Sequence, residues 1–189
     1  FVVHVAYPKH EAKAPALVMI HEWFGLAPET DRMAQQFADA GFVVAAVDLY
    51  GGHLAQTEAE ASQRMMQMNS LAASKLVAAT ARHLSASPRT NGRVGVLGFC
   101  MGGAVTLVCA CHVDEASAFS AFYGIPRADY VDWARTKGPI EMHFAKVDAW
   151  ATPEKAQAIV DAALAVGRCG DEKGHRIAIA LGRMSVRFV

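Results

Sequence analysis

A cysteine set between closely spaced glycines is the clearest candidate for chemistry in this sequence. The segment reads Gly98-Phe99-Cys100-Met101-Gly102-Gly103 and follows the apolar run Val94–Leu97. This is the pattern of a nucleophile elbow, a strained turn between a strand and a helix, with Cys where Ser is usual. Small residues two positions before and after the nucleophile let the two backbones approach closely. The sequence therefore predicts a nucleophilic thiol at Cys100.

The expected place of Cys100 at the start of a helix also indicates how its thiol would be activated. Unpaired backbone N–H groups and the positive end of the helix dipole favour thiolate, so we expect a lowered pKa for Cys100. The backbone N–H of Met101 is expected to point to the position where an oxyanion forms. The glycines match neither the G-x-G-x-x-G pattern nor the P-loop, which also requires a lysine. A glycine-rich turn around a buried, inert cysteine is the alternative.

Strands and helices must alternate along the chain to position such a turn. Apolar runs suited to central strands of a parallel sheet cover residues 16–20, 42–47, 94–97, 119–123 and 140–144. Helical patterns cover about 31–40, 58–84, the segment after 103, and the segment that opens at Pro153. This alternation predicts an α/β domain, and residues 1–189 show no linker or repeat that would divide it. Active sites in such sheets lie beyond the carboxyl ends of the strands.

Composition excludes several classes of function. The 189 residues carry 18 basic and 18 acidic side chains and no block of like charges, so we expect neither a nucleic-acid partner nor an anionic membrane surface. Residues 94–111 lack charge but contain four glycines, and we expect a strand, turn and helix there, not a membrane span. Four cysteines without metal-ligand spacing predict a cytoplasmic protein without disulfides, and Cys109 and Cys111 are expected to be buried thiols. We expect no metal and no cofactor.

Four motifs together resemble the dienelactone hydrolase family of α/β-hydrolases. They are Ile20–Leu26 (IHEWFGL), Val47–Gly52 (VDLYGG), Gly98–Gly103 (GFCMGG) and Tyr123-Gly124. The resemblance extends from about residue 15 to about residue 155. It implies a three-layer α/β-hydrolase fold with a mostly parallel sheet covered by helices on both faces. It also implies hydrolysis of small carboxylic esters or lactones through a thioester acyl-enzyme.

The same resemblance assigns roles to individual residues. Cys100 would be the nucleophile, and Glu22 the carboxylate that lies near the resting thiol and helps to generate thiolate. The N–H groups of Trp23 and Met101 would form the oxyanion hole, and Asp148 would orient the catalytic histidine. Taken alone, Glu22 could equally be a solvated loop residue and Asp148 a turn or cap residue.

The C-terminal part of the chain departs from the family pattern. The triad order on this fold is nucleophile, acid, histidine, and His175 is the only histidine after Asp148. His175 is thus the candidate base, whereas His143, inside an apolar strand, is expected to be a core residue. Residues 167–174 contain no apolar strand, and the family's closing helix has no counterpart before Val189. We therefore expect the chain from about 168 to differ from the family by divergence, truncation or a shifted reading frame.

Two other functions and one physical property remain open at this stage. The thiol could be oxidised reversibly in a redox protein, or the domain could be a non-catalytic member that binds a carbonyl ligand. The resemblance leads us to expect two arginines in a dienelactone-specific enzyme. Position 179, where one of them would stand, is Ile, and the other cannot be assigned to Arg64 from the sequence. Dienelactone itself is therefore not the expected substrate. A hydrophobic content of 53% without a closing helix predicts exposed apolar surface and self-association.

Overall fold

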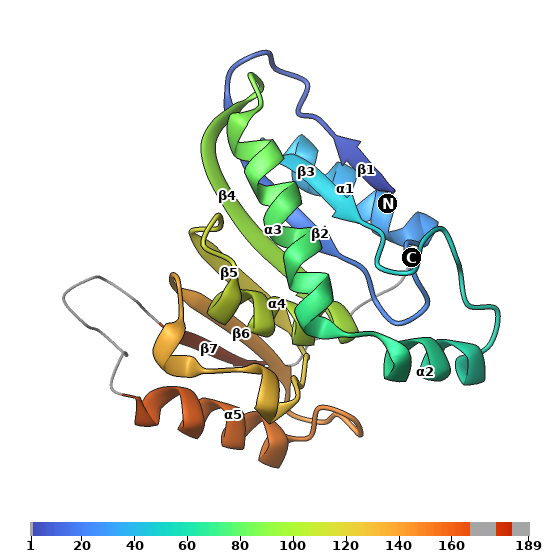
Figure 1. The fold of residues 1–189 in the computed structure, drawn as a ribbon, viewed down its shortest axis with the longest axis vertical. Coiled ribbons are helices and arrows are strands. Elements are labelled where there is room, and N and C mark those ends of the chain that lie inside the picture. The colour runs from blue at the N-terminus through green and yellow to red at the C-terminus, as the bar shows by residue number, and fades with distance from the viewer. Residues whose placement is uncertain (1, 167–176, 183–189) are drawn as a thin grey trace.

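A single seven-stranded sheet organises the part of the chain that the computed structural model describes, residues 2–166 and 177–182. The strand order is β1-β3-β2-β4-β5-β6-β7; β1 pairs antiparallel with β3, and the other neighbours are parallel (Figure 1). The strands are β1 (Val3–Ala6), β2 (Ala14–Ile20), β3 (Val43–Val47), β4 (Thr90–Phe99), β5 (Ala118–Phe122), β6 (Ile140–Ala145) and β7 (Ile177–Gly182). The helices are α1 (Pro28–Asp39), α2 (Glu58–Gln67), α3 (Ser70–Ala86), α4 (Met101–His112) and α5 (Pro153–Ala165), with 3-10 turns at Ala128–Tyr130 and Trp133–Arg135.

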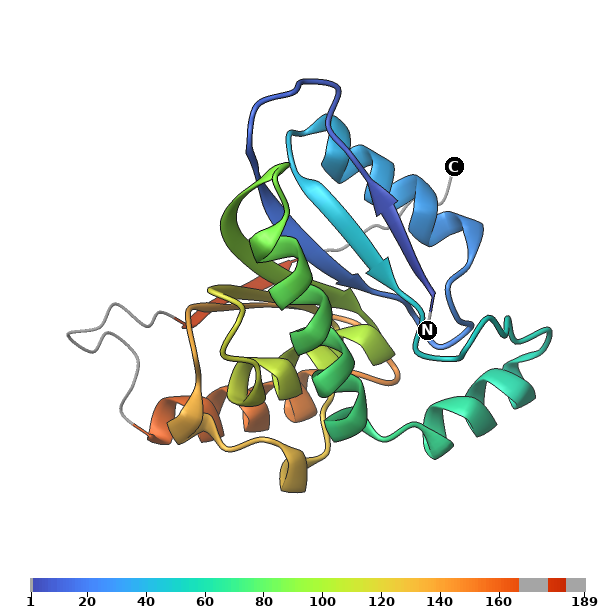
Figure 2. The ribbon, with the colours of Figure 1, turned by 45° about the horizontal axis from the view of Figure 1, so that its top comes forward.

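Helices cover both faces of the sheet, as the sequence predicts. Helices α3, α4 and α5 lie along one face (Figure 2). Alternate side chains of the strands, including Val96, Ala121 and Met142, are buried in the core on that face. On the other face, α1 packs through Ala34 against Met19 and neighbouring strand residues. The three-layer α/β-hydrolase fold is therefore confirmed.

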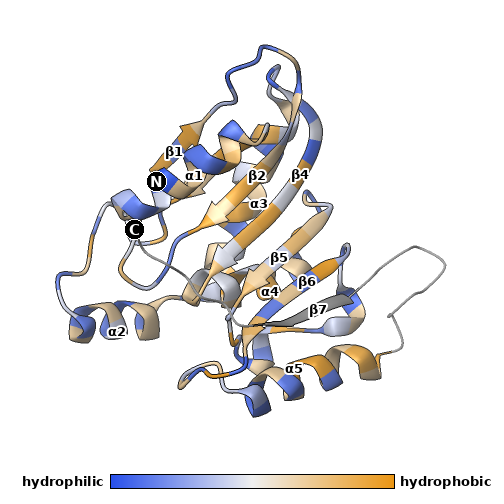
Figure 3. Ribbon diagram, turned by 180° about the vertical axis from the view of Figure 1, so that it is seen from behind, coloured by the Kyte–Doolittle hydropathy of each residue, from blue (hydrophilic) through white to orange (hydrophobic). Residues whose placement is uncertain are grey.

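The second face is covered over only part of its width by the described helices. Seen from behind, α1 lies over β1, β3 and β2, whereas β4, β5 and β6 face the viewer (Figure 3). Phe99, Phe122 and His143 are half-buried there, with ring centroids 4.7 and 4.2 Å apart along the row. His143 also lies 3.3 Å from Glu141, so the expectation of a core histidine is wrong: its side chain lies on the face that α1 does not reach.

The predicted strands are confirmed, and the helices differ in their ends. One long helix was expected over 58–84, but α2 ends at Gln67 and α3 begins at Ser70. Asn69 causes the break, because its side-chain oxygen caps α3 by accepting the N–H groups of Leu71 and Ala72, each at 3.0 Å. Helix α1 begins earlier than expected, with Pro28 in its first turn. Within the described ranges, no helix is long and apolar enough to cross a membrane.

Candidate active site

The turn between β4 and α4 has the geometry of a nucleophile elbow. Cys100 has φ of 55° and ψ of −118°, a strained conformation for a residue with a side chain. A Cβ at Gly98 would collide with the carbonyl oxygen of Gly102, and a Cβ at Gly102 would lie 2.6 Å from the carbonyl oxygen of His21. Both glycines are therefore required for α4 to lie against β4 and the end of β2. The turn leaves the Cys100 side chain at the carboxyl edge of the sheet.

The expected lowering of the Cys100 pKa is wrong for the resting protein. Burial raises the pKa of the thiol, and the nearby carboxylates of Glu22 and Asp148 raise it further. The backbone N–H of Met101 acts in the opposite direction by hydrogen bonding to the sulfur, but it does not outweigh burial. The raised pKa favours the neutral thiol form of Cys100 in the resting protein.

Glu22 reaches the site from the end of β2 and is held there by a residue from another strand. The Tyr123 hydroxyl donates to Oε1 of Glu22 at 2.7 Å. Tyr123 has a φ of 43°, and its own N–H donates to the carbonyl oxygen of His143 at 2.7 Å. Burial raises the pKa of Tyr123, and the Glu22 carboxylate raises it further, so the hydroxyl remains a proton donor. The solvated-loop alternative for Glu22 is not what the structure shows.

Asp148 approaches from the opposite side, after β6. Its carboxylate contributes to the raised pKa of Cys100, which places it in the same electrostatic environment. Its Oδ1 also accepts the backbone N–H groups of Trp150 and Ala151, at 2.7 and 2.8 Å. Asp148 is therefore a turn residue whose carboxylate also acts on the Cys100 thiol by its charge. The orienting of a catalytic histidine by Asp148 stays a prediction, because His175 lies outside the described residues.

Trp23 lies in the turn that follows β2. The Gly25 N–H donates to the carbonyl oxygen of Glu22 at 3.3 Å, which closes a turn with Trp23 and Phe24 at its centre. The register pairs Ile20 with Gly98, so this turn and the nucleophile elbow leave adjacent strands at the same edge. Glu22, Trp23, Cys100 and Met101 thus come together, whereas His175 lies outside the described residues.

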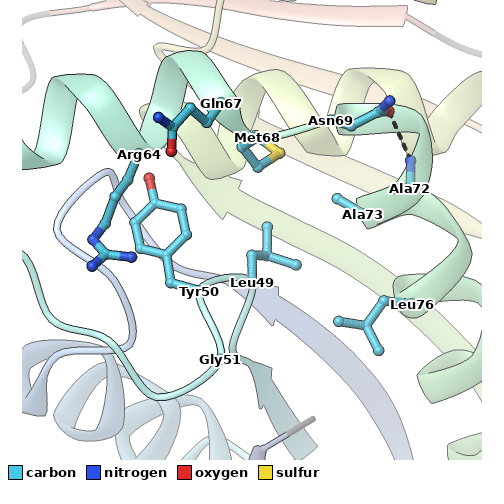
Figure 4. Close-up of a pocket in the computed structure, with 10 residues that line it drawn as sticks. All are labelled: Leu49, Tyr50, Gly51, Arg64, Gln67, Met68, Asn69, Ala72, Ala73 and Leu76. Atoms are coloured by element: carbon cyan, nitrogen blue, oxygen red, sulfur yellow. Dashed lines mark hydrogen bonds between the residues drawn. The ribbon is translucent and has the colours of Figure 1, made fainter.

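Two clefts border this group of residues. One, of about 490 Å³, lies between the loop after β3 and helices α2 and α3, with Arg64 beside the ring of Tyr50 (Figure 4). Tyr50 links it to the elbow, because the Tyr50 hydroxyl lies 3.1 Å from the sulfur of Met101. The other cleft, of about 690 Å³, lies between α1 and the sheet and includes Glu22 and Tyr123 in its wall. Volumes of this order suit small organic ligands.

The remaining described cysteines have no part in the site. Cys109 and Cys111 are fully buried in α4, and burial raises the pKa of both thiols, to about 11 for Cys111. Within residues 2–166 and 177–182, no three His, Cys, Asp or Glu side chains form a group able to hold a metal ion.

Two residues of the site were not predicted from the sequence, although both lie in recognised motifs. Tyr123 precedes the glycine of the Tyr-Gly motif, and His21 precedes Glu22. Tyr123 bonds to Glu22, 101 positions away, and the His21 ring nitrogens lie within hydrogen-bond distance of the backbone of Glu22 and Leu49. No spacing in the sequence shows such contacts. The two motifs could have indicated that Tyr123 and His21 belong to the site, but not which groups they form hydrogen bonds with.

An elbow cysteine at the carboxyl edge of a parallel sheet, with carboxylates on both sides and helices on both faces, defines an α/β-hydrolase. The model of the dienelactone hydrolase family matches residues 1–167, and the chain belongs to that family. The class of enzyme predicted from the sequence, a hydrolase of ester or lactone bonds, is thereby confirmed at the level of the family.

Relatives agree with this membership, and solved structures share the fold. Protein usf of Aquifex pyrophilus is 30% identical over 88% of this chain and 74% of its own length. A carboxymethylenebutenolidase of a Pseudomonas species is 27% identical over 86% of this chain and 71% of its own length. A dienelactone hydrolase-like promiscuous phosphotriesterase from metagenomic libraries has a TM-score of 0.77 at 22% identity, covering 95% of this chain and 75% of that one. The structural likeness shows the shared fold.

Proposed function

We propose that this protein hydrolyses small carboxylic esters or lactones through a covalent thioester on Cys100. The observation that carries the proposal is the elbow: a cysteine at φ 55° between glycines that no larger residue could replace, with the carboxylates of Glu22 and Asp148 near enough to raise the pKa of its thiol. An inert structural thiol needs none of these features. Cys109, buried within α4, provides that contrast in the same chain.

The reaction begins with removal of the thiol proton. Glu22 is the proposed acceptor, since substrate entering between Glu22 and Tyr123 would release the carboxylate from the 2.7 Å hydrogen bond that holds it. The thiolate sulfur then adds to the carbonyl carbon, and the N–H groups of Trp23 and Met101 stabilise the oxyanion. Collapse of this intermediate breaks the carbon–oxygen bond of the ester, and the departing alkoxide takes up the proton that Glu22 removed from the thiol.

Water completes the cycle. We assign the activation of water to His175, oriented by Asp148, following the order of the triad on this fold. Hydroxide adds to the thioester carbon, the carbon–sulfur bond breaks, and the thiolate leaves as the carboxylic acid forms. The thiolate then takes up the proton that His175 removed from water, and the acid product dissociates.

The redox alternative receives less support from the site. Susceptibility to oxidation follows thiolate character, and burial and the two carboxylates keep the pKa of Cys100 raised. A neutral thiol that ionises only on substrate binding suits a hydrolase better than a peroxide sensor.

The test compares two cysteine variants with 4-nitrophenyl acetate and a simple aromatic lactone. Cys100→Ala is expected to lose at least about 100-fold in kcat, because it removes the nucleophile. Cys109→Ala is the matched control and should retain kcat within about twofold. Retained turnover in Cys100→Ala would overturn the proposal. Acylation of Cys100 without release would favour the non-catalytic member, and peroxide consumption without esterase activity would favour the redox protein.

A further inference from the structure

His21 is a fully buried histidine that the proposed reaction does not use. Its side chain has 0% exposure and lies between the two loops that leave β2 and β3. The first loop carries Glu22 and Trp23, and the second carries Leu49 and Tyr50. A polar ring placed here costs free energy unless both of its nitrogens are satisfied.

Both nitrogens of His21 are satisfied, and the partners allow only one arrangement of protons. The Leu49 N–H donates to Nε2 at 3.0 Å, so Nε2 must present its lone pair. The ring proton of neutral His21 therefore resides on Nδ1, which donates to the carbonyl oxygen of Glu22 at 2.6 Å. Burial lowers the pKa of His21, in keeping with a neutral ring.

The acceptor of this bond belongs to the peptide group that carries a proposed oxyanion donor. The carbonyl oxygen of Glu22 and the N–H of Trp23 are two ends of one planar, trans peptide unit. Fixing the direction of the oxygen therefore fixes the direction of the N–H. The other bond to this oxygen, from the Gly25 N–H, is longer at 3.3 Å.

We propose that His21 is a positioning residue that aims the Trp23 N–H at the substrate oxyanion through the rigid Glu22–Trp23 peptide. The inference rests on the proposed esterase function. The imidazole has no contact with substrate in this role. Its contribution is to prevent rotation of that peptide, and a misplacement of about 1 Å at such a site can cost roughly 100-fold in rate.

The same buried cluster also contacts the residue that carries the second donor. The rings of His21 and Tyr50 meet edge to face at 5.0 Å, and the Tyr50 hydroxyl lies 3.1 Å from the Met101 sulfur. Asp48 holds this loop by accepting the Tyr50 N–H at 2.8 Å and also the Gly52 N–H. His21 thus contacts both loops: the loop after β2, which carries Trp23, and the loop after β3, whose Tyr50 contacts Met101.

The two nitrogens can be tested separately with amide side chains. In His21→Asn, the side-chain amide lies near the position of Nδ1 and can still donate to the Glu22 carbonyl. In His21→Gln, the amide lies near the position of Nε2 and can serve Leu49 but not Glu22. We expect His21→Asn to keep kcat within about tenfold, and His21→Gln to lose about 100-fold with KM changed less than threefold.

A second histidine provides the matched control. His112, at the far end of α4, has its Nε2 2.9 Å from the carbonyl oxygen of Tyr130. His112→Asn removes that contact and should leave kcat unchanged. Thermal unfolding of every variant separates loss of folded protein from loss of rate per folded molecule.

The results distinguish this inference from the proposed function. Wild-type kcat in His21→Gln, equal losses in both His21 variants, or losses that match the unfolded fraction would each overturn the positioning role. Cys100→Ala is measured alongside. An inactive Cys100→Ala with a fully active His21→Gln contradicts only the role of His21, whereas an active Cys100→Ala contradicts the proposed function itself.

Discussion

Asp148 offers the sharpest test of the site, because its two sets of contacts respond differently to different substitutions. Its Oδ1 accepts two backbone N–H groups, at 2.7 and 2.8 Å, and its charge contributes to the raised pKa of Cys100. Asp148→Asn retains the side-chain oxygen and removes the charge. Asp148→Ala removes both.

The expected stabilities follow from the two hydrogen bonds. Losing a capping side chain of this kind costs about 0.5–2 kcal/mol, and the half-exposed position of Asp148 favours about 1 kcal/mol. Asp148→Ala should therefore lower Tm by roughly 2–4 °C for a domain of this size. Asp148→Asn should stay within about 0.5 kcal/mol of the wild type, because an amide oxygen can accept the same two bonds.

The expected reactivities follow from the charge. Both substitutions remove a negative charge near the thiol, so the pH midpoint for alkylation of Cys100 by iodoacetamide should move to lower pH. Ester turnover should nevertheless fall in both variants, by at least about 100-fold, since neither can orient a protonated His175. An Asp148→Asn variant with wild-type turnover and an unchanged alkylation profile would show that Asp148 is a turn residue and no more.

Four further results are expected. Glu22→Gln should shift the alkylation midpoint of Cys100 to lower pH, because the carboxylate raises the thiol pKa; no shift would place Glu22 away from the sulfur. Gly98→Ala should destabilise the fold by about 1–3 kcal/mol in urea unfolding, since a Cβ there collides with the backbone of α4; an unchanged midpoint would contradict the close approach. His175→Ala should lower turnover of an activated ester by at least about 100-fold, and unchanged turnover would rule out His175 as the base. Burial lowers the pKa of His21 below 6.5, so the unfolded chain binds its proton first and stability should fall as pH drops below that value; His21→Asn should lose this part of the pH dependence.

The sheet could be predicted from the sequence because its central strands are buried on both sides. All five residues of β3 are buried, and such a strand reads as an unbroken apolar run. Strand β1 gave no comparable signal, since it has only four residues, of which the two in the middle are exposed and the two at the ends half-buried. The break between α2 and α3 depends on the Asn69 cap, which stands within a pattern that is otherwise helical throughout.

The sequence motifs indicated which residues gather at the site, but of their interactions only the steric requirements of the backbone could be predicted. The glycines around Cys100 report a steric requirement, so the elbow was visible in the sequence. The direction of the Cys100 pKa shift could not be predicted from the sequence. The helix N-terminus is a local feature, whereas the burial and the two carboxylates that raise the pKa come from distant parts of the chain. The Tyr123–Glu22 hydrogen bond likewise joins residues 101 positions apart.

The thioester on Cys100 is the central claim, and its direct observation is the decisive measurement. The protein is mixed with 4-nitrophenyl acetate and quenched in acid within the first turnover, and the intact mass and the digested peptides are then analysed. One acetyl group is expected on the peptide that contains Cys100, formed in the burst and lost at the rate of steady-state turnover. Turnover with no adduct, or with the acetyl group on another residue, would contradict a cysteine-based mechanism in this protein.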